Sequence, residues 1–261
     1  MPELDHISQS QISAYATCGE KYRRRYIENE KREWGGNLIV GVSTHKPVEG
    51  YYRKKIKNEL MTFEEMMSIS EEESKKLIDK YGLQILQGET SEMILADIAT
   101  RSFDHLQTFV KEVGPNIDPK LVEFEFSIES EEKWAFNGKI DLVDIDNIIR
   151  DLKTSSTKSN DVDDSLQLTL YWYGYMMATG EMPEGVAIDQ LVRTKSGKCS
   201  YNEYLGTRTS VQIEKAIQVV QAYVDAIRAG IFVPRPRTSS RDWHCSEKFC
   251  EFYKDCKYVT G

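Results

Sequence analysis

The sequence has no run of about 18 apolar residues, so it predicts no transmembrane helix. Its first residues, MPELDHISQSQ, lack both the basic stretch and the apolar stretch of a secretion signal. No GxxxxGK[ST] phosphate loop occurs, which excludes a nucleotide-driven motor within this chain. We therefore expect a cytoplasmic protein with no membrane partner.

Basic residues are fewer than acidic ones: the chain has 34 Lys and Arg and 42 Asp and Glu, which gives a formal net charge of −8. A protein that coats nucleic acid non-specifically needs the opposite sign, so any nucleic acid must be bound at a local basic site. Cysteines number only five, and we do not expect disulfides in the reducing cytoplasm. With 261 residues, 40% of them hydrophobic, the chain can bury a substantial core.

Hydrophobic periodicity divides the chain into a mainly helical part, residues 1–115, and an α/β part, residues 116–232. In the first part it predicts helices at about 9–28, 43–58, 62–81 and 90–113. In the second part it predicts three antiparallel strands between 121 and 154, a helix over 164–180, a hairpin turning at Ser196 and Gly197, and a helix over 210–230. This order indicates an α/β fold with a sheet core flanked by helices.

Two of these strands carry an unusual set of charges, in the stretch GKIDLVDIDNIIRDLKTS at 138–155. Asp151 and Lys153 emerge on one face of the third strand, because side chains alternate with period two. Asp141 on the second strand faces the same space if the register allows. Two carboxylates beside an ammonium suit a Mg²⁺ or Mn²⁺ ion and a water that attacks a phosphodiester. The alternative is an acidic hairpin that only faces solvent.

Four motifs follow one another in a fixed order: GVSTH ending at His45, GKID ending at Asp141, DLK over 151–153, and QLTLY over 167–171. Together they resemble the PD-(D/E)XK nuclease superfamily, and within it the RecB-like exonucleases. That group includes the AddB nuclease domain, CRISPR adaptation nucleases and phage recombination exonucleases. The resemblance spans about residues 9–256. It implies a restriction-endonuclease-like mixed sheet, in one nuclease domain over 1–261.

The resemblance also implies a ligand set for Mg²⁺ or Mn²⁺: His45, Asp141, Asp151 and the backbone carbonyl of Leu152. Glu49, one turn after His45, is then expected to hold the imidazole in one tautomer. Pro47 is tolerable if this helix begins near Ser43 or Thr44, so that the missing N–H falls in the first turn. Glu123 and Glu125 on the first predicted strand are further candidate acids.

The remaining motif residues are expected to serve the reaction itself. The resemblance implies that Lys153 positions or deprotonates the attacking water, or stabilises charge on the phosphate. Of these we favour positioning, because the nearby carboxylates raise the pKa of a lysine. Gln167 and Tyr171, four apart on one helical face, would contact DNA or orient the lysine. The alternative for this pair is helix packing.

Cysteines form a second constellation in the tail HCSEKFCEFYKDC, with Cys245, Cys250 and Cys256 close together. Four thiolates bind Zn²⁺ or an iron–sulfur cluster, and spacing alone cannot choose Cys18 or Cys199 as the fourth. The resemblance implies Cys18, because iron–sulfur members of the family join one early cysteine to three at the C-terminus. We expect a 4Fe-4S clamp joining the tail, 233–261, to the first helix. The first cysteine gap departs from the family pattern, so structural Zn²⁺ and buried thiols remain alternatives.

Two basic segments could bind a nucleic acid backbone. KYRRRY places Arg23, Arg24 and Arg25 between Tyr22 and Tyr26, and PRPRTSSR adds three arginines over 234–241. Such a surface binds phosphates while its tyrosines stack bases. The alternative is a solvated helix face with tyrosines in the core.

These features together indicate a metal-dependent DNA nuclease, an exonuclease on single-stranded DNA or duplex ends. Its expected setting is recombination, repair, phage replication or CRISPR adaptation, with a helicase or recombination protein as candidate partner. The alternatives are a structure-specific endonuclease of the same fold, or an inactive DNA-binding module with a structural metal clamp. Retention of Asp141, Asp151 and Lys153 argues against inactivity.

Overall fold

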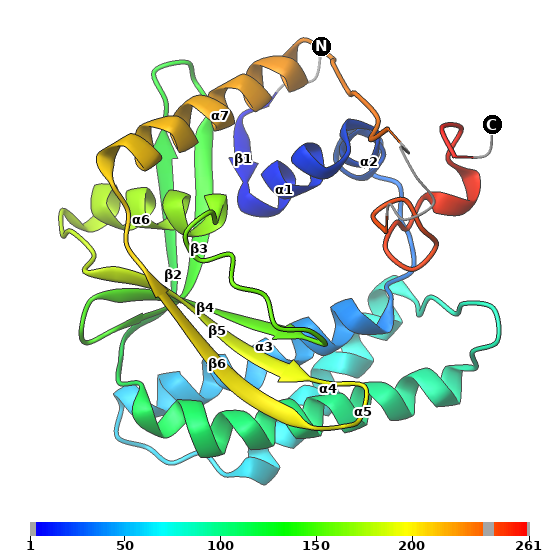
Figure 1. Cartoon of the computed structure of the whole chain (residues 1–261), viewed down its shortest axis with the longest axis vertical. Coiled ribbons are helices and arrows are strands. Elements are labelled where there is room, and N and C mark those ends of the chain that lie inside the picture. Colours follow the sequence, from blue (N-terminus) through cyan, green and yellow to red (C-terminus); the bar gives the residue numbers. More distant parts are fainter. Residues whose placement is uncertain (1–3, 237–242, 260–261) are drawn as a thin grey trace.

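One mixed sheet of six strands forms the centre of the protein in the computed structural model, which describes residues 4–236 and 243–259 (Figure 1). Helices cover both faces of this sheet, with α6 and α7 on one side and α3, α4 and α5 on the other. Within the described ranges no helix is long and apolar enough to cross a membrane.

The sheet has the strand order β1-β3-β4-β5-β6, and β2 pairs with the other edge of β3. Its strands are β1 His6–Ser8, β2 Pro119–Glu129, β3 Ala135–Asp144, β4 Ile148–Ser155, β5 Gly185–Arg193 and β6 Cys199–Gly206. The antiparallel β2-β3-β4 order and the β5–β6 hairpin confirm the prediction, and β4 and β5 are parallel. The parallel pairing of β1 with β3 was not predicted, because three residues are too few to show a period.

The described residues form seven α-helices, and caps visible in the sequence begin several of them. They are α1 Gln9–Thr17, α2 Gly19–Tyr22, α3 Gly36–Ile56, α4 Phe63–Tyr81, α5 Ser91–Thr108, α6 Leu166–Thr179 and α7 Ser210–Arg228. Capping boxes start α1, α4 and α7, with Ser8, Thr62 and Thr209 as N-caps. A π-helical turn, Phe109–Val113, continues α5 to the predicted end.

The prediction of one continuous helix over 9–28 is wrong. It breaks at Cys18, whose backbone is extended, and resumes as α2 and a π-helical turn, Arg23–Ile27. The break lets Gly19 donate its N–H to the carbonyl of Val233 at 2.8 Å. A Cβ at Gly19 would lie 2.6 Å from the Val233 nitrogen, so only glycine permits this approach.

The predicted start of the next helix is also wrong. Helix α3 begins at Gly36 rather than near Ser43, which places Pro47 in the helix interior. A proline there removes one backbone hydrogen bond and costs roughly 3 kcal/mol. The first turns of α3 offset this cost by burying Ile39 and Val40 completely against α4 and α5. Tertiary packing therefore outweighs the local signal.

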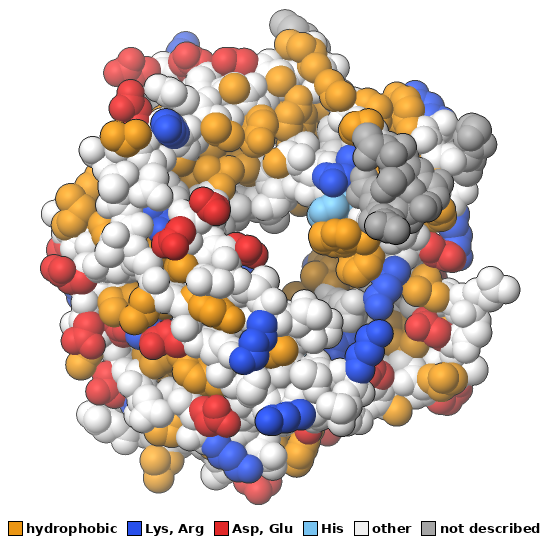
Figure 2. Space-filling model, in the orientation of Figure 1, with side chains coloured by type: hydrophobic (Ala, Val, Ile, Leu, Met, Phe, Trp, Pro, Cys, Tyr) orange, Lys and Arg blue, Asp and Glu red, His pale blue; other side chains and the backbone are white. Residues whose placement is uncertain are grey.

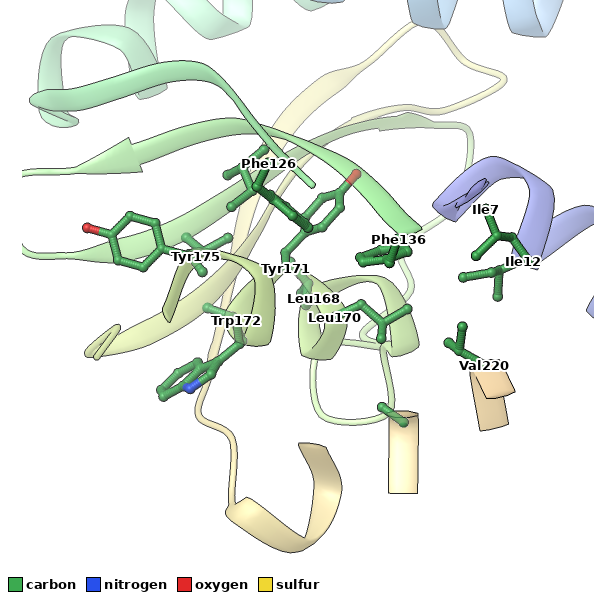
Figure 3. Packing of buried hydrophobic residues seen from close by; sticks show 14 of the residues in the cluster. Ile7, Ile12, Phe126, Phe136, Leu168, Leu170, Tyr171, Trp172, Tyr175 and Val220 are labelled. Atoms are coloured by element: carbon green, nitrogen blue, oxygen red, sulfur yellow. The ribbon is translucent and has the colours of Figure 1, made fainter. Parts of the chain in front are cut away.

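Two glycines, one on β3 and one on α6, allow this helix to approach the sheet closely. The ring of Phe126 on β2 lies between Gly138 and Gly174, and Figure 3 shows it beside Tyr171 and Phe136. A Cβ added at Gly138 or Gly174 would come within 2.1 or 2.2 Å of that ring. The glycine of the GKID motif is thus required by packing.

Helix α5 buries a histidine that has no hydrogen-bond partner among the described residues, His105. Burial lowers its pKa from 6.5 to about 4, and the charges of Arg101 and Arg193 add to this effect. The unfolded chain therefore takes up a proton at higher pH than the folded one, so stability is present above pH 6.5 and is lost as the pH falls towards 4. This loss is a stability effect separate from any catalytic titration.

We expect His105→Leu to remove this acid sensitivity. In urea unfolding at stepwise pH, the wild type should lose about 3 kcal/mol more than the variant between pH 7 and 4. The exposed His6 provides the control, because His6→Gln should retain the wild-type profile. Equal losses in His105→Leu and the wild type would contradict the assignment.

Candidate active site

The motif acids meet where β3 and β4 separate. These strands pair only at Leu142 with Arg150 and Val143 with Ile149. Continuing this register by one residue places Asp141 opposite Asp151, on one face of the sheet. Instead of a further ladder bond, the N–H of Leu152 donates to Asp141 Oδ2 at 3.2 Å. The strand separation thus turns a side-chain carboxylate towards the neighbouring backbone.

Asp151 is held by a network that joins β4 to α6. Lys153 Nζ lies 2.8 Å from Asp151 Oδ2 and donates to Gln167 Oε1 at 3.1 Å. Gln167 Nε2 in turn donates to Asp151 Oδ1 at 2.9 Å and contacts the Tyr171 hydroxyl at 3.1 Å. The Asp151 side chain is 4% exposed, whereas that of Lys153 is 45% exposed. The Lys153 ammonium is therefore held by two partners while its side chain remains accessible to a ligand.

His45 reaches the same place from α3. Its Nδ1 lies 3.4 Å from Asp141 Oδ2. Glu49 lines the same cavity as His45 and Asp141, but its two oxygens accept hydrogen bonds from Lys46 and Arg53. In the part of the chain that the structure describes, Glu49 makes no hydrogen bond to the imidazole. The predicted tautomer-holding contact is therefore absent here, and Asp141 is the acid nearest to Nδ1.

Burial and charge shift two of these groups in ways that affect chemistry. Burial raises the pKa of Asp141 to about 6; His45 lowers it, and the Asp151 carboxylate raises it further. Burial lowers the pKa of Lys153, but the Asp151 carboxylate and its hydrogen bond raise it by more, so the net pKa lies above its ordinary value. Lys153 is thus a fixed positive charge, and the crowded acids favour a positive ligand.

A third acid, Glu123, stands in the same row on β2. The β2–β3 register places it opposite Asp141, and it lines the cavity with His45. Its φ of 54° is left-handed, which is strained for a residue other than glycine. Period-two reasoning had put Glu123 and Glu125 on one face with no means of choosing. The structure distinguishes the two acids, because Glu123 lines the cavity whereas Glu125 is exposed.

Beneath the site lies a buried ion network that sequence reasoning missed. Arg150 donates to Asp144 at 2.6 Å, to Asp189 at 3.0 Å and to Glu203 at 2.9 Å. Tyr201 adds a 2.6 Å hydrogen bond to Asp189. Arg150 and Asp189 also line the cavity that contains Asp141. Strand alternation carried no signal for this network, because its acids belong to three different strands.

The described residues contain no group of three or more His, Cys, Asp or Glu side chains arranged as a finished metal site. The ligand chemistry nevertheless suits a hard divalent cation. Asp141 and Asp151 supply carboxylate oxygens on adjoining strands. Burial, and then the neighbouring Asp151 carboxylate, raise the pKa of Asp141, and a bound cation would compensate the charge that both disfavour. His45 adds an imidazole, which suits Mn²⁺.

The four cysteines of the predicted clamp line one cavity between the tail and the start of the chain. They are Cys18, Cys245, Cys250 and Cys256. The Cys18 sulfur accepts a 3.2 Å hydrogen bond from the backbone N–H of Arg235. Cys199 lies elsewhere, near Thr108 at the end of α5. The four predicted cysteines thus line one cavity and the fifth lies elsewhere, although the described residues as they stand form no group of three or more that could hold a metal ion.

The KYRRRY segment does not form the expected nucleic-acid surface. Its arginines are ion-paired with acids, Arg23 with Glu20 and Glu28, Arg24 with Glu30 and Asp255, and Arg25 with Glu251. Tyr22 is completely buried and packs on Tyr26, so it has no face for a base. Arg24 and Arg25 hold the tail through Asp255 and Glu251, whereas Arg23 pairs with acids of its own segment. The core alternative applies to Tyr22. Of the second basic segment, Arg237 and Arg241 lie outside the described residues.

Both the sequence and the fold of this chain are similar to those of known proteins. The family model of the PD-(D/E)XK nuclease superfamily matches residues 6–257. A crystal structure of a "Putative exonuclease" from Eubacterium rectale superposes with a TM-score of 0.55 at 12% identity, covering 90% of this chain and 86% of that one.

A second structure, of a protein named SSO0001, has a TM-score of 0.35 at 15% identity, with 88% of each chain covered, and supports no argument. A search of curated proteins found no significant match. The family match extends over almost the entire chain and includes all four motifs. The chain therefore belongs to the PD-(D/E)XK nuclease superfamily.

Proposed function

We propose that this protein is a metal-dependent DNA exonuclease acting on single strands or duplex ends, with residues 1–261 as one nuclease domain. The convergence of Asp141, Asp151 and Lys153 where β3 and β4 separate carries this proposal. The similar fold of the protein described as a "Putative exonuclease" leads us to favour the exonuclease over the endonuclease alternative.

The residues at the site divide the work of hydrolysis. Lys153, whose raised pKa keeps it protonated, supplies fixed positive charge to a phosphate oxygen and positions the attacking water. Gln167 fixes Lys153 and Asp151 relative to each other, because it hydrogen-bonds to both. Tyr171 anchors the amide of Gln167. These contacts preorganise the charge before substrate arrives.

A Mg²⁺ or Mn²⁺ ion would be held by His45, Asp141, Asp151 and the carbonyl of Leu152. When bound, such an ion supplies Lewis-acid polarisation of the phosphate and lowers the pKa of a bound water. The protein's share is to keep the two carboxylates close despite their repulsion. The Leu152 N–H donates to Asp141, and Lys153 and Gln167 hold Asp151.

The assay that tests the proposal follows DNA labelled at the 5′ or the 3′ end, with Mg²⁺ or Mn²⁺ and with EDTA as control. Metal-dependent release of short products from linear strands, with circular single strands left intact, would support the exonuclease and give its polarity. Cleavage of circles would favour the endonuclease alternative. No cleavage of any strand form would favour an inactive DNA-binding module.

We further propose that Cys18, Cys245, Cys250 and Cys256 hold a structural 4Fe-4S cluster, with Zn²⁺ as the alternative. Their shared cavity is the supporting observation. Soft thiolate ligands fit either group, and the place of the cavity between the tail and α2 suits a clamp rather than redox chemistry.

Metal analysis of anaerobically purified protein distinguishes these cases. We expect bound iron with a broad absorption band near ~400 nm, and loss of most of it in Cys18→Ser and Cys250→Ser. Cys199→Ser is the matched control and should keep wild-type content, because Cys199 lies away from the cavity. Stoichiometric zinc without the band would identify the alternative. Wild-type metal content in Cys18→Ser would contradict the clamp.

A further inference from the structure

The described tail displays aromatic rings that the fold does not bury. Trp243 is 56% exposed, Phe249 is 43% exposed and Tyr258 is 46% exposed. Large exposed rings are costly to leave in water and are enriched where proteins bind ligands. Resting on the proposed function, we propose that Trp243 and Phe249 form a stacking platform for unpaired bases of the single-stranded substrate.

The two rings are in direct contact. Their centroids lie 4.8 Å apart at 74°, an edge-to-face pair in which each ring presents a differently oriented face. His244 stacks on Trp243 with a centroid distance of 3.5 Å, which supports the indole from one side. The Ser246 hydroxyl donates to the Trp243 carbonyl at 2.6 Å and fixes the turn between the rings. The platform is therefore held by its own local contacts.

Positive charge accompanies these rings. Lys248 Nζ lies 5.7 Å from the Phe249 centroid, and Lys257 Nζ lies 4.9 Å from the Tyr258 centroid. Single-strand binders combine such rings with cations, because rings stack bases while cations follow the phosphates. The tail thus offers the combination that KYRRRY was predicted to provide and cannot, since its arginines are ion-paired.

The location fits a strand on its way to the active site. Figure 1 shows the tail, in red and orange, across the middle of the view from β3. Figure 2 shows an opening through the molecule between these two parts, with hydrophobic, Lys and Arg side chains on the tail side and acidic side chains on the other. The tail and β3, which carries Asp141, thus lie on opposite sides of this opening.

The tail is anchored well enough to serve as a platform. Arg24 and Arg32 each make two contacts with the tail. Both pair with Asp255, and their guanidinium groups lie 4.4 and 5.3 Å from the centroid of the Phe252 ring. Gln84 donates to the Glu247 carbonyl at 3.1 Å. These bonds hold Trp243 and Phe249 in a defined place relative to the rest of the chain.

The test compares two oligonucleotides of equal length, one single-stranded DNA and one abasic, which keeps the phosphates but lacks bases. Binding is measured by fluorescence anisotropy in EDTA, so that no cleavage occurs. We expect the wild type to prefer the base-containing strand by roughly tenfold or more. Trp243→Ala and Phe249→Ala should lose most of this preference, and Trp243→Phe should retain most of it.

Controls separate stacking from folding and from catalysis. Phe103→Ala removes a ring that is 41% exposed on α5, and should keep the wild-type preference. Lys248→Gln should weaken both oligonucleotides equally and reduce the salt dependence. Thermal melting and metal content report on tail folding, and if Trp243→Ala disturbs them, Phe249→Ala and Trp243→Phe decide the question.

Equal affinity of the wild type for both oligonucleotides would overturn the platform, as would a preserved preference in both alanine variants. Cleavage of the base-containing strand with Mg²⁺ is scored separately. Cleavage without base preference would leave the nuclease proposal standing and end this one. Base preference without cleavage would keep the platform and end the nuclease proposal.

Discussion

Replacing Lys153 with alanine should lower kcat for DNA cleavage by roughly 10²- to 10³-fold, with a smaller effect on KM. In the proposed mechanism its ammonium, fixed between Asp151 and Gln167, provides charge stabilisation chiefly in the transition state. Single-turnover cleavage of end-labelled single strands, with Mg²⁺ or Mn²⁺, measures the loss. A kcat within threefold of the wild type would remove Lys153 from the proposed mechanism.

Asp151→Asn provides the companion measurement. The amide keeps the shape of the side chain but loses the charge that attracts a cation, so we expect an equally severe loss at any metal concentration. Lys76→Ala is the matched control, because Lys76 is an exposed lysine that pairs with Glu72 on α4, far along the chain from the motif residues. Urea unfolding of all three variants shows whether a loss of activity reflects unfolding.

We expect Gly174→Ala to cause a large loss of stability, although it adds only a single methyl group. The new Cβ would lie 2.2 Å from the Phe126 ring, and α6 must move away from β2 and β3 to relieve the clash. Overpacking of this kind costs about 3 kcal/mol, offset by about 1 kcal/mol from the better helix propensity of alanine. We therefore expect a net loss of about 2 kcal/mol in urea unfolding.

Two further variants test this explanation. Gly50→Ala adds the same methyl in α3 at ordinary contact distance from Met61, and should stabilise by up to about 1 kcal/mol. Phe126→Leu combined with Gly174→Ala should be less destabilised than the sum of the single variants, because the smaller side chain relieves the clash. Additive effects would show that the ring is not responsible.

Local signals predicted much of this fold correctly. Period-two alternation predicted β2, β3 and β4, and helical periodicity predicted α4 and α7 with bounds close to those observed. The motif order predicted which side chains would meet, since Asp141, Asp151 and Lys153 lie together with Gln167. Their catalytic and metal-binding roles remain predictions.

The errors came from contacts between distant segments. Helix α3 begins at Gly36 because Ile39 and Val40 are buried by other helices, which no local rule reveals. The arginines of KYRRRY look free in sequence, but their partners Glu251 and Asp255 lie more than 220 residues later. The left-handed backbone of Glu123 likewise follows from the sheet around it.

The ion pairs that hold the tail have a consequence for the order of folding. The bond between Arg24 and Asp255 joins residues 231 positions apart. Contacts of such separation form late, because the entropy of closing a long loop must be lost before the contact provides any stabilisation. During synthesis the sheet can assemble from residues already made, whereas the tail can dock only after residue 255 is available. We expect refolding to show a slow, salt-sensitive final phase that reports the docking of the tail.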